Sequence, residues 1–168
     1  MTGVQTCALP ISLYVAELGS GNLVKVSPDG KERSIVAKEL RGPAALAKGR
    51  DNVLYVTENA AGAVTLIDVA SGARKVVADG LAGPEGIDVG PDGRLYVAEV
   101  GQKRIVAIDP ASGAKTVIAS NLDIGLESYP GGPPMLVTTG VAVGSGGAVY
   151  VSSDRRNAMY KLTPPPKE

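Results

Sequence analysis

Histidine, tryptophan and phenylalanine are absent from the 168 residues of this chain, and cysteine occurs only once, as Cys7. From Ser12 onward the chain therefore cannot supply a Ser-His-Asp or Cys-His nucleophile, a histidine-ligated zinc or a histidine-based lyase centre. No glycine-rich phosphate loop stands between a strand and a helix, so nucleotide binding lacks support. Any aromatic stacking would have to come from the six tyrosines.

An excess of charge of either sign is lacking as well. The 17 basic and 17 acidic residues cancel, and a neutral chain with scattered Lys and Arg gives no reason to expect nucleic acid or an anionic membrane as a partner. No run approaches the roughly 20 apolar residues that a membrane-spanning helix needs, so we expect no membrane span.

Residues 1–11 form a segment of a different kind. They resemble the conceptual translation of a common sequencing-library adapter, so we interpret them as an artefact and exclude them from the fold. A signal-peptide remnant is the alternative, but the segment has no basic n-region and too short an apolar stretch. Because Cys7 belongs to this segment, the rest of the chain is silent on redox compartment, and we expect the natural N-terminus to lie upstream.

A repeat runs through the remainder of the chain. Leu13–Glu17 recurs as Leu54–Glu58 and as Leu95–Glu99, and the tyrosine of each copy lies 41 residues after the last (55 − 14 = 41 and 96 − 55 = 41). A fourth copy, Val149–Ser153, follows after 54 residues (150 − 96 = 54). The additional residues fall in Asp123–Met135, which we interpret as an insertion.

Each repeat unit contains four short runs that alternate between apolar and polar residues, as strands do. In the unit 80–121 the runs are Gly86–Val89, Arg94–Ala98, Arg104–Ile108 and Lys115–Ala119. The last unit holds three, Thr138–Val143, Ala148–Ser152 and Ala158–Leu162. Turn sequences such as Gly90-Pro91-Asp92-Gly93 separate the runs, with proline presetting φ and glycine accepting a positive φ.

Four antiparallel strands in a unit of about 40 residues, repeated, predict an all-β fold, a partial β-propeller of about 3.5 four-stranded blades. The expected blades are 12–37, 38–79, 80–121 and 136–163, with an inserted loop at 123–135 and a proline-rich tail at 164–168. A β-sandwich is the alternative, but it does not explain an identical 41-residue register.

The unit motif Gly83-Pro84-x-Gly86-Ile87-x-Val89-x-x-Asp92-Gly93-x-Leu95–Glu99, followed by Arg104-Ile105-Val106, resembles an NHL repeat. It is also similar to the SMP-30/gluconolactonase-like group. The resemblance implies a six-bladed propeller and an extracellular or periplasmic location. It also implies either a divalent cation (Ca or Zn) in a metal-dependent enzyme or no cofactor in a binding module.

Carboxylates recur at fixed places in the units. Glu17, Glu58 and Glu99 each end a second strand, and Asp68 and Asp109 each precede the turn to a fourth strand. A ring of glutamates could bind cations. We favour the other interpretation, in which these carboxylates accept hydrogen bonds from backbone N–H groups or from a nearby Arg and so hold the blade corners.

Glu85 breaks the repeat, because Ala44 takes its place in the preceding unit and Thr139 in the next. It begins an innermost strand, near the channel where propellers bind ligands. In the SMP-30-like resemblance such a position holds a metal ligand, so Glu85 is a candidate metal ligand and, with Thr139, a candidate ligand-binding residue. However, Asn is usual at this position, and a second carboxylate is lacking at Ala44 or Thr139. A solvated carboxylate at the channel mouth is the alternative that we favour.

The insertion supplies two further candidates, Glu127 and Tyr129, which could cover the channel mouth and select a ligand. The alternative is a surface loop without such a role. Arg155, Arg156 and Asn157 in the last loop between second and third strands are expected to be solvated.

Two functions follow from these features. The first is a non-catalytic NHL-type propeller that binds a protein or small-molecule ligand at its face. The alternative is a metal-dependent hydrolase or lactonase of the SMP-30/gluconolactonase type, with most of its site on blades that this chain does not contain.

The end units predict that the chain alone self-associates or aggregates through open edges and faces. Each missing blade contact exposes roughly a few hundred Å² of apolar surface, which costs on the order of 10 kcal/mol as an upper bound. Sedimentation velocity should therefore show oligomers or aggregates. A monodisperse monomer that unfolds cooperatively would contradict the expectation.

Overall fold

The computed structural model describes residues 13–127, 129–130 and 139–163. They contain fourteen strands and two short 3₁₀ turns, η1 (Asn59–Ala61) and η2 (Val100–Gln102). The strands, in chain order, are β1 (Leu13–Glu17), β2 (Asn22–Val26), β3 (Arg33–Ala37), β4 (Pro43–Lys48), β5 (Val53–Glu58), β6 (Ala63–Asp68), β7 (Arg74–Ala78), β8 (Pro84–Val89), β9 (Leu95–Glu99), β10 (Arg104–Ile108), β11 (Lys115–Ala119), β12 (Val141–Val143), β13 (Val149–Ser153) and β14 (Ala158–Leu162). None of the helices in these ranges is long and apolar enough to cross a membrane.

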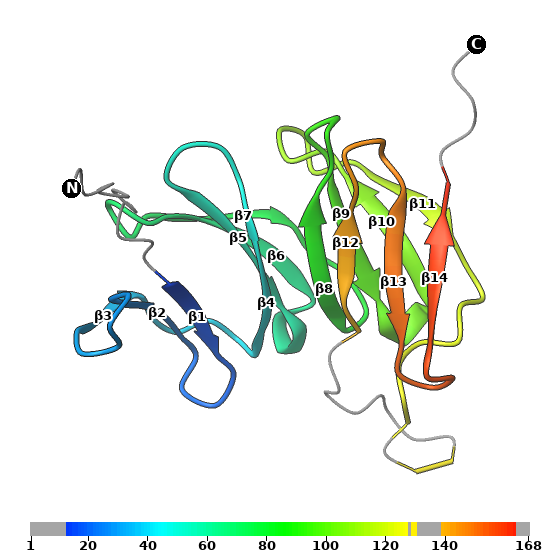
Figure 1. Cartoon of the computed structure of the whole chain (residues 1–168), viewed down its shortest axis with the longest axis horizontal. Coiled ribbons are helices and arrows are strands. Elements are labelled where there is room, and N and C mark those ends of the chain that lie inside the picture. Colours follow the sequence, from blue (N-terminus) through cyan, green and yellow to red (C-terminus); the bar gives the residue numbers. More distant parts are fainter. Residues whose placement is uncertain (1–12, 128, 131–138, 164–168) are drawn as a thin grey trace, which may run out of the picture.

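The strands form four antiparallel sheets in chain order: β1–β3, β4–β7, β8–β11 and β12–β14. Each sheet is a simple meander, because every strand pairs with the next one along the chain. Figure 1 shows the four sheets side by side, from the blue sheet to the orange and red one. The structure therefore confirms an all-β, partial propeller and excludes the sandwich, in which two sheets would face each other.

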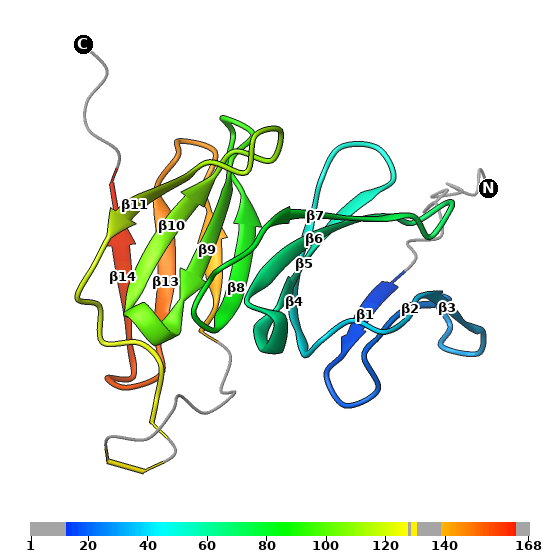
Figure 2. The same ribbon diagram turned by 180° about the vertical axis from the view of Figure 1, so that it is seen from behind.

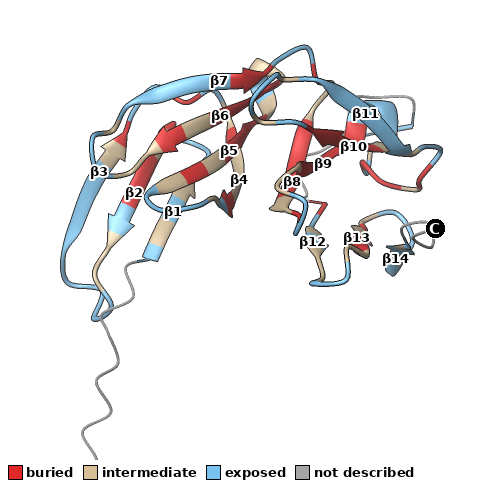
Figure 3. Cartoon of the chain, turned by 90° about the horizontal axis from the view of Figure 1, so that it is seen from above, coloured by how far each residue is buried: buried red, intermediate tan, exposed pale blue. Residues whose placement is uncertain are grey.

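The sheets are arranged as propeller blades around one side of an axis. Strand β4 contacts both β1 and β8, and β8 contacts β12, so the inner strands of neighbouring sheets are adjacent. In the view from above, β3, β7 and β11 lie along the outer, largely exposed margin (Figure 3).

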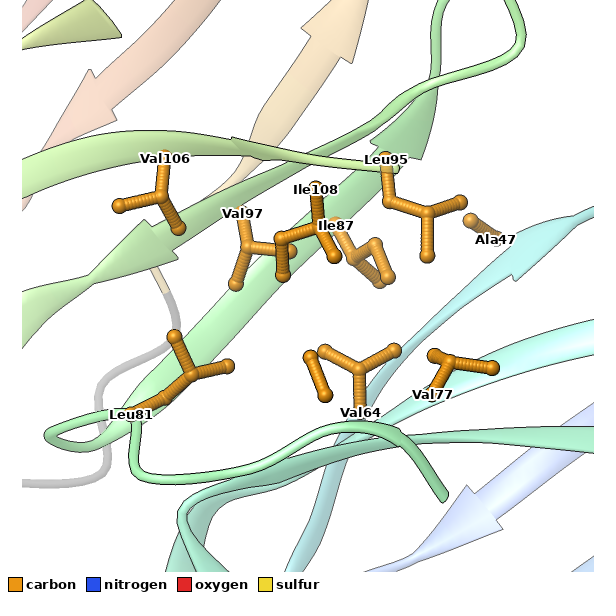
Figure 4. Packing of buried hydrophobic residues seen from close by; sticks show 10 residues of the cluster. Ala47, Val64, Val77, Leu81, Ile87, Leu95, Val97, Val106 and Ile108 are labelled. Carbon is orange, nitrogen blue, oxygen red and sulfur yellow. The ribbon is translucent and has the colours of Figure 1, made fainter. Parts of the chain in front are cut away.

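The cores lie between consecutive sheets. One cluster joins Val64 and Val77 of the second sheet to Ile87, Val97 and Ile108 of the third (Figure 4). Residues adjacent in sequence to these, such as Ala98 and Ala107, belong to a second cluster shared with the fourth sheet. Successive side chains of a strand point to opposite faces, so the third sheet buries both faces.

Gly62 brings the turn between β5 and β6 close to the linker after β7, whereas Lys103, with φ of 51°, takes its place in the third sheet. Gly62 has φ of 63° and accepts a hydrogen bond at its carbonyl from the Leu81 amide, at 2.8 Å. A Cβ on Gly62 would lie 2.4 Å from the Leu81 carbonyl oxygen. A larger residue would therefore combine an unfavourable backbone conformation with a clash.

The first strand of the last sheet is shorter than predicted. We expected Thr138–Val143, whereas β12 begins at Val141, and position 138 lies outside the described residues. The Thr139 amide donates to Glu85 Oε2 at 2.6 Å and the Gly140 amide to Ser152 Oγ at 2.7 Å. The Gly140 amide thus bonds a side chain instead of a backbone carbonyl of β13, although the Ser152 amide still donates to the Gly140 carbonyl at 3.0 Å.

We predict that Ile108→Ala lowers the free energy of unfolding by about 2–5 kcal/mol, because a large side chain is removed from between two sheets. Ile108 is fully buried, whereas Ile118 on the neighbouring strand is 39% exposed. Ile118→Ala is thus the matched control, with an expected loss of about 1 kcal/mol or less. Urea unfolding followed by circular dichroism measures both, and equal losses would contradict the packing described here.

Candidate functional site

The recurring glutamates hold the blade corners. Glu99 accepts a hydrogen bond from the Ala82 amide at 2.9 Å and pairs with Arg104 Nε at 2.6 Å. Glu58 accepts from the Arg41 amide at 2.6 Å and from the Thr65 hydroxyl. The interpretation of these carboxylates as corner acceptors is confirmed.

The remaining members of the series behave in the same way. Glu17 accepts from the Ser20 hydroxyl at 2.7 Å and pairs with Arg33. Asp68 and Asp109 accept amide hydrogen bonds within their turns, at 2.8 Å for the closest of each. Backbone amides, with Ser71 and Ser112 foremost, lower the pKa of the two aspartates. All five carboxylates therefore have structural roles.

Glu85 differs from these acids. It lies in β8 with 1% of its surface exposed, and only one of its oxygens, Oε2, has a donor, the Thr139 amide at 2.6 Å. Oε1 is buried without a hydrogen-bond partner. The expectation of a solvated carboxylate at the channel mouth was therefore wrong, because the start of the fourth sheet covers Glu85.

Thr139 and Asp154 complete this site. Thr139 is fully buried, and its hydroxyl lies beside the Glu85 carboxylate, but Oγ1 makes no well-formed hydrogen bond. Asp154 follows β13; its Oδ2 accepts from the Leu126 amide at 2.6 Å, while Oδ1 is buried without a partner. We call Glu85 Oε1, Thr139 Oγ1 and Asp154 Oδ1 the oxygen cluster.

Burial raises the pKa of Glu85, since it penalises the charged form. Hydrogen bonds from Thr139 oppose this rise, and the negative charge of Asp154 adds to it. The charge of Asp154 thus acts on Glu85 from a distance, whereas Thr139 contacts it directly through its amide.

Sequence reasoning placed Glu85 and Thr139 correctly as a pair but missed Asp154. The available signal was Ser153, which takes the corner position of Glu99 in the last unit (153 − 99 = 54, the same spacing as the tyrosines). The acid that ends the second strand is thus displaced by one residue, onto Asp154.

The oxygen cluster contains two carboxylate oxygens without a donor and one hydroxyl, which can both donate and accept, and such a set suits a small cation or a ligand N–H group. Its ligands would be oxygens alone, the type that Ca²⁺ takes, whereas zinc prefers nitrogen and sulfur. Within the described ranges, no three His, Cys, Asp or Glu side chains gather to hold a metal. The two carboxylates would therefore need the hydroxyl or further oxygens to complete a cation shell.

The insertion lies at the same end of the sheets as the oxygen cluster (Figure 1). Its Glu127 pairs with Arg155 at 2.9 Å and with Lys103 at 3.6 Å, and its Asp123 pairs with Arg156 at 2.6 Å. Arg155, Arg156 and Asn157 are exposed, as expected, and the two arginines also form these ion pairs. Tyr129 is 63% exposed and is not brought to the cluster by any contact. Positions 128 and 131–135 of the insertion lie outside the described residues.

Known proteins resemble the chain in fold. A family model described as strictosidine synthase-like, N-terminal, matches residues 71–100. No curated protein sequence matches the chain significantly. Virginiamycin B lyase from Staphylococcus aureus is 19% identical with a TM-score of 0.61, over 99% of this chain and 59% of the lyase. The chain thus spans little more than half of that protein.

Two other solved structures are similar. A chain of a nidogen–laminin complex is 16% identical with a TM-score of 0.63, over 90% of this chain and 72% of that one. A putative gluconolactonase is 19% identical with a TM-score of 0.67, over 91% and 57% respectively. These likenesses agree with the resemblance of the repeat to NHL and SMP-30-like propellers, and at this identity they establish the fold.

We predict that the free energy of unfolding falls less with rising pH in Glu85→Gln than in the unmodified protein. The pKa of folded Glu85 is raised, so the folded state holds this proton more tightly than the unfolded state, whose pKa is near 4.5. Stability therefore falls as pH rises from about 4.5 through the raised pKa. Urea midpoints measured from pH 4 to pH 8 should fall less in the variant.

Asp109→Asn is the control, because the pKa of Asp109 is shifted in the opposite direction and the variant should show the same fall from pH 4 to pH 8 as the unmodified protein. The pKa of Asp109 is lowered by amide hydrogen bonds from Ser112 and Ala111, so its contribution is present above the ordinary pKa and is lost as pH falls below it. A Glu85→Gln profile parallel to that of the unmodified protein would show that Glu85 does not carry the effect.

Proposed function

We propose that the chain is part of a non-catalytic, NHL-type binding propeller, whose protein or small-molecule ligand contacts the end of the sheets where β8 and β12 begin. The oxygen cluster is the observation that carries this proposal. Buried polar atoms without a well-formed hydrogen bond are costly in a folded protein, and a ligand that places a cationic or N–H group against the two carboxylate oxygens would offset that cost.

The neighbouring loops support binding at this end. The insertion is held to the loop between β13 and β14 by the pairs Glu127–Arg155 and Asp123–Arg156, and Tyr129 is largely exposed beside them in sequence. A loop joined in this way to a rigid scaffold is a common place for recognition. The likeness to a chain from a nidogen–laminin complex is consistent with a role in protein binding.

The residues of this chain favour binding over the chemistry of its lyase relative. A histidine-to-alanine variant of that lyase, solved with Quinupristin, is described as catalytically inactive. This chain has no histidine at all. The residues of this chain therefore include no counterpart to the histidine that was replaced in the lyase.

A metal-dependent hydrolase or lactonase is the second candidate, and the same oxygen cluster favours it. Glu85, Thr139 and Asp154 could supply three oxygens to a Ca²⁺ ion, with the rest of the shell from elsewhere in the intact protein. The putative gluconolactonase among the similar structures makes lactones the substrates to try first.

The binding proposal is tested with methylguanidinium and CaCl₂ as separate probes, added to ¹⁵N-labelled protein. The Thr139 and Leu126 amides report on the site, because they donate to Glu85 and Asp154. We expect saturable shifts of both amides with methylguanidinium, and affinity at least about tenfold lower in Glu85→Gln and Asp154→Asn, as lost charged hydrogen bonds imply.

Asp92→Asn is the matched control, since Asp92 pairs with Arg94 in the turn at the other end of β8. Its binding should be unchanged. Saturable Ca²⁺ binding that depends on Glu85, together with gluconolactone hydrolysis by the intact protein, would replace the proposal by the hydrolase. Shifts with neither probe would exclude both.

A further inference from the structure

The chain contains three steps in which an aspartate is followed directly by a glycine, at residues 29–30, 79–80 and 92–93. At such a step the backbone can close on the aspartate side chain, because the glycine nitrogen approaches the carboxyl carbon without a Cβ in the way. The first and third steps lie in turns between strands, and the second lies in the linker from β7 to β8. In Figure 2 the chain leaves β7 and bends toward the start of β8, between the second and third sheets.

In the two turns, the glycine amide and the aspartate carboxylate are both engaged in hydrogen bonds. Gly30 donates its amide to the Ser27 carbonyl at 2.9 Å, and the Ser27 hydroxyl donates to Asp29 at 2.6 Å. The turn between β8 and β9 is arranged similarly: Gly93 donates its amide to a carbonyl of the same turn at 2.9 Å, and Asp92 accepts from a guanidinium at 2.7 Å. Ring closure in either turn therefore requires the turn to open first.

The step in the linker lacks this protection. Within the described part of the chain, neither the Asp79 carboxylate nor the Gly80 amide has a hydrogen bond or an ion pair. Both residues are exposed, and Gly80 has φ of 65°, in the region that favours glycine. The two groups that would form the ring are thus both available in the folded protein.

A cation lies against this same peptide. Lys115 Nζ donates to the main-chain carbonyl oxygen of Asp79 at 2.5 Å, and it is 3.9 Å from the point where a Cβ on Gly80 would stand. The equivalent contact between the first two sheets joins Arg74 to the carbonyl of Lys38, a residue without a carboxylate. In the linker after β7, by contrast, the cation meets the carbonyl of an aspartate that precedes glycine.

We propose that Asp79-Gly80 is a site of spontaneous isomerisation to isoaspartate and that Lys115 directs this reaction. The Gly80 nitrogen bonds to Asp79 Cγ, and the carboxyl hydroxyl leaves with the amide proton as water, so a succinimide ring forms. Water then adds to the former main-chain carbonyl carbon and breaks its bond to the Gly80 nitrogen, which regains a proton. The chain now runs through Cγ. The water lost is regained, so mass is unchanged and no oxidant or reductant is needed.

The position of Lys115 selects which ring carbonyl is opened. Attack of water at Cγ regenerates aspartate, whereas attack at the former main-chain carbonyl gives isoaspartate. Negative charge develops on the oxygen of the carbonyl that is attacked, and Lys115 contacts the main-chain oxygen. The new carboxylate forms at this oxygen. A hydrogen bond from Lys115 of the third sheet to the linker after the second thus becomes an ion pair.

Incubation of the full chain in ¹⁸O-enriched water at neutral pH for several weeks tests the site. Digestion and electron-transfer fragmentation distinguish isoaspartate from aspartate at each step, and ¹⁸O marks every residue whose ring has opened. We expect at least about fivefold more isoaspartate at Asp79 than at Asp29 or Asp92, because the turns must first lose hydrogen bonds. In guanidinium chloride, which unfolds the turns, the three steps should react at similar rates.

Lys115→Met tests the direction of ring opening separately from its rate. At position 79 the ratio of ¹⁸O-labelled isoaspartate to ¹⁸O-labelled aspartate should fall at least about threefold, because a charged hydrogen bond to the attacked carbonyl is lost. Lys75→Met is the matched control, since Lys75 is exposed on β7 and forms no ion pair with any described residue; the ratio should stay the same. Asp79→Glu should give no isomerised product at this position.

Equal isoaspartate at the three steps of the folded chain would overturn the assignment of the site. An unchanged ratio in Lys115→Met would overturn the role of Lys115. The comparison of the three steps uses the original sequence, so it decides the first point even where a variant fails to fold. None of these measurements involves the oxygen cluster.

Discussion

The packing of each sheet on the next is the constraint on which the rest of the structure depends. No single four-stranded meander can bury its apolar faces alone, so alternate residues of one strand serve two different cores. In β9, Val97 belongs to the core shared with the second sheet, and Ala98 to the core shared with the fourth. The hydrogen bond from the Leu81 amide to the Gly62 carbonyl ties the linker after β7 to the turn between β5 and β6, and the Glu99–Arg104 pair joins β9 to β10. The shared cores set the spacing between the sheets.

This spacing explains why Glu85 is buried. Because the start of the fourth sheet is brought close to β8, a Cβ on Gly86 would lie 2.2 Å from the Thr139 carbonyl oxygen, and Glu85 has no path away from its neighbour. The same contact lets the Thr139 amide donate to the carboxylate and lets the charge of Asp154 act on it. A buried acid whose pKa is raised in this way is more common at sites of binding or chemistry than elsewhere in a fold.

The repeat made most of the fold predictable. The 41-residue spacing, the alternation within the runs and the turn sequences identified the sheets, and the corner acceptors followed from their recurrence. The features that could not be predicted depend on contacts with a neighbouring sheet or strand. The burial of Glu85 requires knowledge of the sheet that covers it. At the start of β12 the Gly140 amide bonds the Ser152 side chain instead of a backbone carbonyl. Asp154 was missed because it stands one residue beyond the recurring position.

Val77 and Ile118 also show that the burial of a residue depends on the neighbouring sheet. The two residues occupy one position of the repeat and have similar character, yet one is buried and the other is open. Exposure in this fold therefore depends on the adjoining sheet as well as on the strand itself. Val77 is buried where the turn that contains Gly113 packs on its strand. It follows that the informative places in a repeat protein are those where the neighbour changes. In this chain one such place is the contact between β8 and the start of the fourth sheet, where Glu85 meets Thr139.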